Sequence, residues 1–387
     1  MVPRARAAVA VLRPRLEPRR HPDPRADGET SVRRSGELVP GPGVRAARFH
    51  RFARAVRRGL AGPRRRRRPD DRGRRRSPGA RSRMTVAESR WLSAHVFYHG
   101  DLDGIVRGIV ASMAQVPPRD CFFLRYWEGG PHVRLRVRLE SEDERPVVTE
   151  VVRERAERFL ALEPSTVSMT DAAYQRIRRE AMVREPDATA PAPGMYPDNT
   201  VAFLPYRPEH GKYGHGAVLR AVERHFCAAS ALALRVVRDM PRSGRVVLAL
   251  CLLASAWNIG CGGPAPLRAW AAGRRHDGRW LLVSDPAART RAAPVISWLL
   301  EDFEPSRSED PANATVRQLW SESMRTLRAG LVNAGVSDDV EAPEPTTASI
   351  ADHCAHLMCN RIGVPIEREA RLRGLITEAV LEPDEVS

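Results

Sequence analysis

Apolar and polar positions alternate along the chain in two different patterns. Residues 91–205 mix short apolar runs typical of strands with stretches of helical spacing, in the order strand, helix, strand, strand, helix, strand. That order predicts a ferredoxin-like split βαβ unit with a mixed sheet. The predicted strands cover residues 92–98, 121–127, 132–139 and 200–205, the predicted helices cover 101–113 and 141–162, and residues 175–198 fit this scheme least well.

The two middle strands are predicted to form a hairpin. They are separated by Glu128-Gly129-Gly130-Pro131. Glycine permits the positive φ angles that a tight reversal needs, so the chain can turn back on itself here.

Beyond Gly214 the pattern becomes helical, and we assign the chain to the α+β class. The α/β part covers residues 84–213 and the helical part covers 214–387. The most apolar run, residues 246–259, is shorter than the ~20 residues that cross a bilayer and predicts a buried helix. Predicted helices cover residues 216–239, 244–258, 288–303, 312–334, 347–361 and 366–381.

The net charge of +16 comes from the first 83 residues. They hold 26 of the 63 Arg and Lys but only 7 of the 47 Asp and Glu, which leaves residues 84–387 with a net charge of −3. Such an Arg/Pro-rich segment cannot bury enough apolar surface to fold and is predicted to be disordered. We favour a mis-set start, with patterned sequence opening at Met84; a nucleic-acid-binding arm and a targeting peptide are the alternatives.

The cysteines indicate a reducing compartment. Six cysteines occur without a CxxC pair and without a recognisable signal peptide. We therefore expect free thiols and a cytoplasmic protein.

The second strand of the hairpin carries the most conspicuous polar pattern. Side chains alternate faces along a strand, so His132, Arg134, Arg136 and Arg138 are expected on one face. Arg125 and Trp127 on the partner strand are candidates for the same face. Such a cationic row needs an anion over it or acidic neighbours, and a solvated outer face is the alternative interpretation.

Several separated motifs resemble the small, glutamate-eliminating domain of lantibiotic dehydratases and its free-standing relatives in thiopeptide-type bacteriocin biosynthesis. The resemblance covers essentially all of the chain after Met84. The matching stretches are Phe122-Phe-Leu-Arg125-Tyr-Trp-Glu-Gly-Gly-Pro-His132-Val-Arg134-Leu-Arg136, Tyr206-Arg-Pro-Glu209-His-Gly-Lys212-Tyr213-Gly214, Glu223-Arg-His-Phe226-Cys-Ala-Ala-Ser230 and His356-Leu-Met-Cys-Asn360-Arg361.

The resemblance implies β-elimination of glutamate from glutamylated Ser or Thr in a ribosomal precursor peptide, giving dehydroalanine or dehydrobutyrine. A separate chain would supply the glutamylating domain. Removing an α-proton suits a histidine near neutral pH, and arginine matches the carboxylate of the departing glutamate.

Site residues carried over from the family fall into two groups. The catalytic group is His356 as general acid/base with Arg134 and Arg136 on glutamate or the enolate. The substrate-binding group is Arg125, His132, Glu209, Lys212, Tyr213, Asn360 and Arg361. Lys212 stands where the family usually has Arg, which keeps the charge but loses the planar fork.

No cofactor or metal is predicted. His353, Cys354, His356 and Cys359 crowd one helix, but zinc sites normally gather three or four ligands at recognisable spacings and no second ligand pair stands out. No glycine-rich phosphate loop follows a strand, so nucleotide binding is not supported.

Two other functions compete with the lyase. One is a thiopeptide pyridine synthase, which joins two dehydroalanines by a formal aza-[4+2] cycloaddition and expels the leader peptide; retention of Arg134, Arg136, Glu209 and His356 favours the lyase over it. The other is a non-catalytic subunit that presents the precursor peptide. The expected partners are the precursor peptide, the glutamylating chain and a second copy in a homodimer, with no membrane and no nucleic acid for residues 84–387.

Overall fold

The computed structural model describes residues 90–113, 120–184, 194–274, 286–301 and 314–382. The basic segment 1–83 and the start at Met84 lie outside the described residues. Those that are described fall within one contiguous compact unit, Val86–Ser387.

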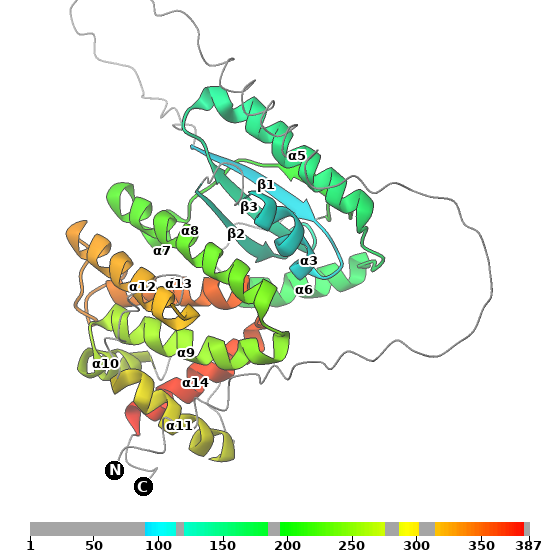
Figure 1. The fold of residues 1–387 in the computed structure, drawn as a ribbon. Coiled ribbons are helices and arrows are strands. Elements are labelled where there is room, and N and C mark those ends of the chain that lie inside the picture. The colour runs from blue at the N-terminus through cyan, green and yellow to red at the C-terminus, as the bar shows by residue number, and fades with distance from the viewer. Residues whose placement is uncertain (1–89, 114–119, 185–193, 275–285, 302–313, 383–387) are drawn as a thin grey trace, which may run out of the picture. The chain divides into compact units, whose positions relative to one another are not determined.

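Four antiparallel strands form a single sheet in the order β2-β3-β1-β4 (Figure 1). The α+β class is confirmed, whereas the expectation of a mixed sheet is wrong, because every neighbouring pair of strands is antiparallel. The first predicted helix is present as α3, a π-helical turn η1 and α4, and the second as η2 and α5. The bounds are β1 Trp91–Phe97, α3 Leu102–Ile105, η1 Val106–Val110, α4 Ala111–Met113, β2 Cys121–Tyr126, β3 His132–Arg138, η2 Glu142–Glu144, α5 Arg145–Leu162 and β4 Thr200–Phe203.

The predicted hairpin joins β2 and β3. Gly129 and Gly130 have φ angles of 76° and 105°, so both occupy backbone conformations that other residues rarely adopt. The amide of Gly130 donates to the carbonyl of Trp127 at 3.0 Å and closes the turn.

One face of the sheet is apolar and fully buried. Val133, Leu135 and Val137 of β3 are at most 1% exposed and share a continuous core with Val106 of η1 and Val152 of α5. Burying this face against the helices supplies the apolar burial that stabilises the α/β part.

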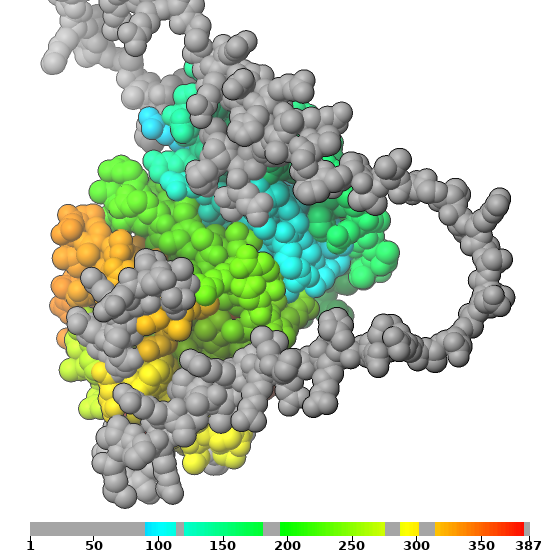
Figure 2. Space-filling view, in the orientation of Figure 1, coloured from blue at the N-terminus to red at the C-terminus, as the bar shows by residue number. Residues whose placement is uncertain are grey.

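The outer edge of β2 is paired by side chains of two helices instead of by a fifth strand. The amide of Phe123 donates to Ser230 Oγ of α8 at 3.1 Å, and its carbonyl accepts from Arg361 Nε of α13 at 2.9 Å. The side chain of Asn360 bonds the residue two positions further along β2: it accepts from the amide of Arg125 and donates to its carbonyl, both at 2.9 Å. These contacts join the sheet to the helical part, whose α8 surface (green) adjoins the cyan surface of the sheet region in Figure 2.

The helical part follows the predicted pattern closely and adds α10 to it, and the short α7 comes directly before it. Its helices are α7 His210–Tyr213, α8 Gly216–Asp239, α9 Arg242–Cys261, α10 Pro264–Arg274, α11 Pro286–Glu301, α12 Val316–Asn333, α13 Thr347–Arg361 and α14 Ile366–Leu381.

Helix α9 contains the apolar run that the sequence assigned to a buried helix. Among the described helices it alone is long and apolar enough to cross a membrane. However, 72% of its most apolar window is buried inside the protein, which is typical of a core helix.

The sequence did not predict α6 (Asp171–Arg184) or α10. Helix α6 lacks an apolar stripe, and it is anchored by one residue: Tyr174 is 1% exposed and its hydroxyl accepts from the amide of Gly129 at 2.9 Å. Helix α10 opens with Pro264-Ala-Pro266, which suggests a loop, although proline is well tolerated in a first helical turn.

We predict that Asn360→Ala destabilises the protein. The substitution leaves the amide and carbonyl of Arg125 without their partners, and a buried unpaired polar group costs about 1–3 kcal/mol. The midpoint of thermal unfolding should fall by several degrees, at roughly 2–4 °C per kcal/mol for a domain of this size. Asn333→Ala at the exposed end of α12 is the control; an equal shift in both variants would contradict a joint at this edge.

Candidate functional site

The face of the sheet opposite the apolar core gathers polar side chains from β1 and β3. In the register of the two strands, Ser93 lies opposite Arg136, His95 opposite Arg134 and Phe97 opposite His132. Residues directly opposite each other point to the same face. We call Ser93, His95, His132, Arg134 and Arg136 the polar cluster.

The polar cluster is largely buried. His132 is 0% exposed, Arg136 7%, His95 6% and Ser93 3%. A solvated outer face, the alternative interpretation from sequence, is therefore wrong for this part of β3. Only Arg138 at the strand end is exposed, where it pairs with Asp120 at 3.0 Å.

Arg125 does not belong to this face. It lies opposite Val133, so its side chain is on the other face of the sheet, and the expectation that it joins the arginine row is wrong. Its guanidinium bonds Asp103 Oδ1 at 2.6 Å and the carbonyl of Arg361 at 3.0 Å. Asp103 also pairs with the buried Arg245 at 2.8 Å, so Arg125 is part of an ion-pair network that holds α3, β2 and α9 together.

Arg134 has its charge compensated within the protein. Its Nη2 pairs with Glu128 at 2.9 Å, and its guanidinium carbon lies 3.4 Å from the ring centroid of Tyr126. Its Nε donates to His132 Nε2 at 3.3 Å, while His132 Nδ1 faces the carbonyl of Gly130 at 2.8 Å. His132 is therefore a neutral ring that is protonated on Nδ1, and its Nε2 orients Arg134.

Arg136 is buried and has no acidic partner among the residues that the structure describes. Its Nε and Nη1 have no hydrogen-bond partner, and the same holds for Ser93 Oγ and His95 Nε2 beside it. Burial and the charge of Arg134 lower the pKa of Arg136 to about 9. Buried polar atoms in native proteins are almost always paired. Four unpaired atoms on neighbouring residues of one sheet face therefore indicate a binding site, and the buried cation favours an anion.

The two histidines of the cluster are held neutral. Their rings stack at 4.9 Å. Burial and, to a smaller extent, the charge of Arg136 lower the pKa of His95 to about 2. Burial is also the largest cause for His132, and together with the charge of Arg134 it lowers the pKa of His132 to about 3. At neutral pH the cluster thus offers one uncompensated cation together with neutral donors.

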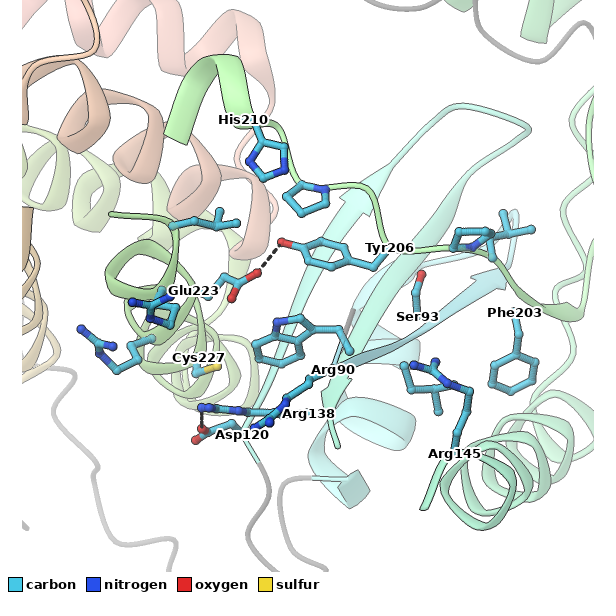
Figure 3. A pocket seen from close by; sticks show the side chains of 18 of the residues that line it. Arg90, Ser93, Asp120, Arg138, Arg145, Phe203, Tyr206, His210, Glu223 and Cys227 are labelled. Carbon is cyan, nitrogen blue, oxygen red and sulfur yellow. Dashed lines mark hydrogen bonds and ion pairs between the residues drawn. The ribbon is translucent and has the colours of Figure 1, made fainter. Parts of the chain in front are cut away.

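A cavity of about 990 Å³ opens beside the polar cluster, between α8 and the start of β1 (Figure 3). Tyr206 stands at its centre and donates to Glu223 of α8 at 3.0 Å. The guanidinium carbon of Arg136 lies 5.5 Å from the centroid of the Tyr206 ring. Because Ser93 and Tyr206 line the cavity and also adjoin Arg136, the cavity leads to the polar cluster.

His356 is the terminal residue of a buried chain of charges. Its Nδ1 lies 3.0 Å from Glu369 Oε2, and Glu369 accepts from Arg373 Nε at 2.8 Å. Arg373 also binds Asp352, which accepts from Trp257 Nε1 at 2.7 Å. The carboxylate fixes the ring through Nδ1, so Nε2 is the nitrogen placed to exchange a proton, and the half-exposed side chain can meet a substrate.

The remaining predicted residues fall into two places. Glu209 and Lys212 form an ion pair at 2.7 Å, next to the buried Tyr213. Asn360 and Arg361 lie at the β2 edge; Arg361 is 0% exposed and stacks over Phe226, yet its Nη1 and Nη2 have no partner. Within the described residues, no hydrogen bond or ion pair joins His356 to Arg134 or Arg136.

The sequence analysis missed Ser93, His95, Tyr206 and the partners of His356. Ser93 and His95 alternate with Ala94 and Val96 in β1, so the same period-two pattern that revealed the arginines could have revealed them. Glu369 and Arg373 are four residues apart on α14, but their contact with His356 depends on how α13 and α14 pack.

Cysteine placement agrees with the expectation of free thiols, since all six are unpaired. Cys354 and Cys359, which share a helix with His356, are side chains of the apolar core. Among the described residues, no three His, Cys, Asp or Glu side chains are grouped as metal ligands would be.

The fold and site thus define an α+β protein with a buried cationic cluster beside a large cavity. The chain belongs to the family described as the lantibiotic biosynthesis dehydratase C-terminal domain, which matches residues 91–380.

Three solved structures align with the chain at low identity, and the first of them shows the same fold. The pyridine synthase TbtD from thiomuracin biosynthesis is 20% identical with a TM-score of 0.56, over 76% of this chain and 98% of that one. The tRNA-dependent lantibiotic dehydratase MibB from Microbispora sp. 107891 is 20% identical with a TM-score of 0.46, over 77% and 28%. TsrL is 17% identical with a TM-score of 0.48, over 75% and 93%. No curated protein matches the chain.

We predict that the buried histidines make the protein less stable below neutral pH. The pKa is about 2 for His95 and about 3 for His132 in the folded state, against 6.5 when exposed. Above pH 6.5 neither state binds the proton, whereas below it the unfolded state takes up protons that the folded state refuses. The free energy of unfolding should therefore fall between pH 6.5 and 5, by up to ~1.4 kcal/mol per pH unit for each histidine.

Urea unfolding at pH 7, 6 and 5 measures this slope. His132→Asn keeps a donor toward Gly130 and should reduce the slope by one proton. An unaltered slope in His132→Asn would mean that His132 is protonated in the folded protein.

Proposed function

We propose that the protein is the lyase of a split lantibiotic-type dehydratase, which eliminates glutamate from glutamylated Ser or Thr of a ribosomal precursor peptide. The observation that carries the proposal is the buried Arg136, which has no acidic partner and has unpaired donors beside Ser93 and His95. Such a site suits a group that arrives neutral and departs as a carboxylate, because its charge is stabilised most after the bond breaks.

The reaction balances without any added reagent. A base takes the α-proton of the glutamylated residue, the Cα–Cβ double bond forms, and the Cβ–O ester bond breaks. Glutamate leaves as a carboxylate, and the peptide keeps a dehydroalanine from Ser or a dehydrobutyrine from Thr. The base is reset when it gives its proton to water.

Residue roles follow from the contacts. Arg136 receives the departing carboxylate and Arg134, held by Glu128 and His132, adds a second cation. His356 takes the α-proton on Nε2 while Glu369 holds its Nδ1. The two sites come together only around a bound substrate, which spans them.

The other predicted residues have supporting places in this proposal. Glu209 and Lys212 form the ion-pair frame beside Tyr213, and the free Nη atoms of Arg361 keep it as a candidate substrate-binding residue. Asn360 and Arg125 hold the frame on which these groups stand.

A thiopeptide pyridine synthase is the second candidate function. It is motivated by the alignment with TbtD, which spans 98% of that chain. A cyclase acts on dehydroalanines and binds no glutamyl ester, so it has less use for a buried unpaired cation. A non-catalytic, peptide-presenting subunit is the third candidate.

The proposal implies partners and a compartment. The precursor peptide and a separate glutamylating chain would act with this protein in the cytoplasm, and a homodimer is compatible with it. We also propose that the sheet and its helices form a ferredoxin-like split βαβ unit, supported by the strand order β2-β3-β1-β4, with α6 as an addition before β4.

Peptide mass distinguishes the candidate functions. A Ser-glutamylated precursor peptide incubated with the protein should lose glutamate and yield dehydroalanine, and the glutamyl adduct should persist with His356→Ala. If glutamylated peptide stays unchanged but a peptide already bearing dehydroalanines loses its leader, the protein is a cyclase. If neither peptide changes, it presents peptide without catalysing either step.

We predict that Arg136→Gln separates activity from stability. The substitution should slow elimination by about 10²–10³-fold, as expected for loss of one group that stabilises developing charge. It should leave the unfolding midpoint unchanged or raise it, because it removes a buried charge that no acidic group compensates. Single-turnover kinetics and thermal unfolding measure the two effects, with Arg158→Gln on the exposed face of α5 as control. A stable variant with normal activity would exclude Arg136 from the reaction.

A further inference from the structure

We propose that the cavity beside Tyr206 binds an acidic segment of the peptide substrate next to the reacting residue. This inference rests on the proposed function, because it takes the substrate to be a peptide whose reacting residue lies at the polar cluster. It assigns a role to the cavity wall, and above all to Arg220 and Arg224 of α8, which take no part in the elimination.

The floor of the cavity is apolar. It is made by Trp91 of β1, Phe203 of β4, Leu219 of α8 and the prolines Pro205 and Pro208 that follow β4. Its volume of about 990 Å³ is at the upper end of the ~300–1,000 Å³ usual for small-molecule sites. A segment of several peptide residues therefore fits into it.

The rim of the cavity is cationic. Five arginines line it against two acidic residues, Asp120 and Glu223, and Figure 3 shows Arg90, Asp120 and Arg138 together on one side with Arg145 on another. Asp120 is paired with Arg138, whereas Glu223 accepts from the neutral Tyr206 and keeps its charge, so the five arginines exceed the two carboxylates by three charges. The lining residues with charge are Arg90, Arg138, Arg145, Arg220, Arg224, Asp120 and Glu223.

Three rim cations have no ion pair among the described residues: Arg90 and, on α8, Arg220 and Arg224. The two arginines of α8 are exposed, lie four residues apart and so point to the same side of the helix. Within the described part of the chain neither forms an ion pair, whereas Arg145 pairs with Glu142 at 2.7 Å. Two arginines one turn apart over an apolar floor fit a peptide in which acidic and apolar residues alternate.

The cavity and the polar cluster share a wall. Ser93 lines the cavity and lies opposite Arg136 in the sheet, and Tyr206 lines the cavity with its ring toward Arg136. A peptide with its reacting residue at Arg136 can therefore extend along the cavity toward α8.

Charge and shape select the acidic peptide over other occupants. The N-terminal segment of this chain, residues 1–83, carries a net charge of +19 and would be repelled by the rim. A nucleic acid would use the arginines, but a floor rich in proline and leucine offers little to its backbone.

A binding measurement with defined probes tests the proposal. The probes are two fluorescein-labelled octapeptides, one alternating Asp and Leu and the other alternating Lys and Leu, titrated with the full chain and followed by fluorescence anisotropy. We expect the Asp–Leu peptide to bind, its affinity to fall with salt, and the Lys–Leu peptide not to bind. The double variant Arg220→Glu/Arg224→Glu should weaken binding of Asp–Leu by about tenfold, equivalent to ~1.4 kcal/mol.

The matched control is Arg158→Glu/Arg371→Glu, which makes the same change in net charge at exposed positions on α5 and α14. Equal weakening in the two double variants, or no binding of Asp–Leu by the native chain, would overturn the proposal. Displacement of the bound peptide by tRNA at equimolar concentration would also overturn it and favour a nucleic-acid site.

Two measurements distinguish failure of this inference from failure of the proposed function. They are binding of Asp–Leu, followed by anisotropy, and loss of glutamate from the glutamylated peptide, followed by mass, each made on the native chain and on Arg220→Glu/Arg224→Glu. Retained, Arg220-dependent peptide binding in a protein that never eliminates glutamate would reject the lyase and keep the peptide site. Elimination of glutamate without Arg220-dependent binding would reject the peptide site and keep the lyase.

Discussion

The structure depends on how the outer edge of β2 is satisfied. An exposed strand edge presents unpaired amides and carbonyls, and proteins usually cover such edges or make them short. Here Ser230, Asn360 and Arg361 replace a neighbouring strand by bonding the backbone of Phe123 and Arg125. Each of these side chains comes from the helical part, so the sheet edge is complete only when α8 and α13 are docked. Folding of the two parts is thereby coupled.

That coupling also decides what each face of the sheet can do. Arg125 is fixed at the edge with its side chain on the apolar face, where Asp103, which also pairs with Arg245, compensates its charge. The opposite face is left to Ser93, His95 and Arg136, whose polar atoms find no partner in the protein. Unpaired buried groups cost stability, so they persist where a ligand uses them. One face of the sheet thus stabilises the fold, and the opposite face carries the groups that can bind a ligand.

Those features of the fold and the site that a local sequence pattern encodes could be predicted from the sequence. The period-two pattern of β3 predicted that Arg134 and Arg136 share a face, and the helical spacing of 216–239 and 347–361 matches α8 and α13. The position of Arg125 could not be predicted, because strand register is set by the hairpin turn and decides which face each residue takes. Helix α6 depends on one tyrosine bonded to a distant turn, and Glu369 reaches His356 only through the packing of α13 on α14. These are tertiary contacts that no local pattern encodes.

The different surroundings of His356 and Arg136 have a physical logic of their own. His356 lies against Glu369, whereas Arg136 forms no ion pair with a carboxylate of the described residues, so each has the electrostatic environment that its role requires. A base beside an acidic group can accept a proton, whereas a carboxylate beside Arg136 would occupy the place of the leaving group. If both groups shared one site, Glu369 would neutralise the cation that the departing glutamate needs. Separation along the bound peptide avoids that conflict, and the arginine rim of the cavity would provide the binding energy that places one substrate across both.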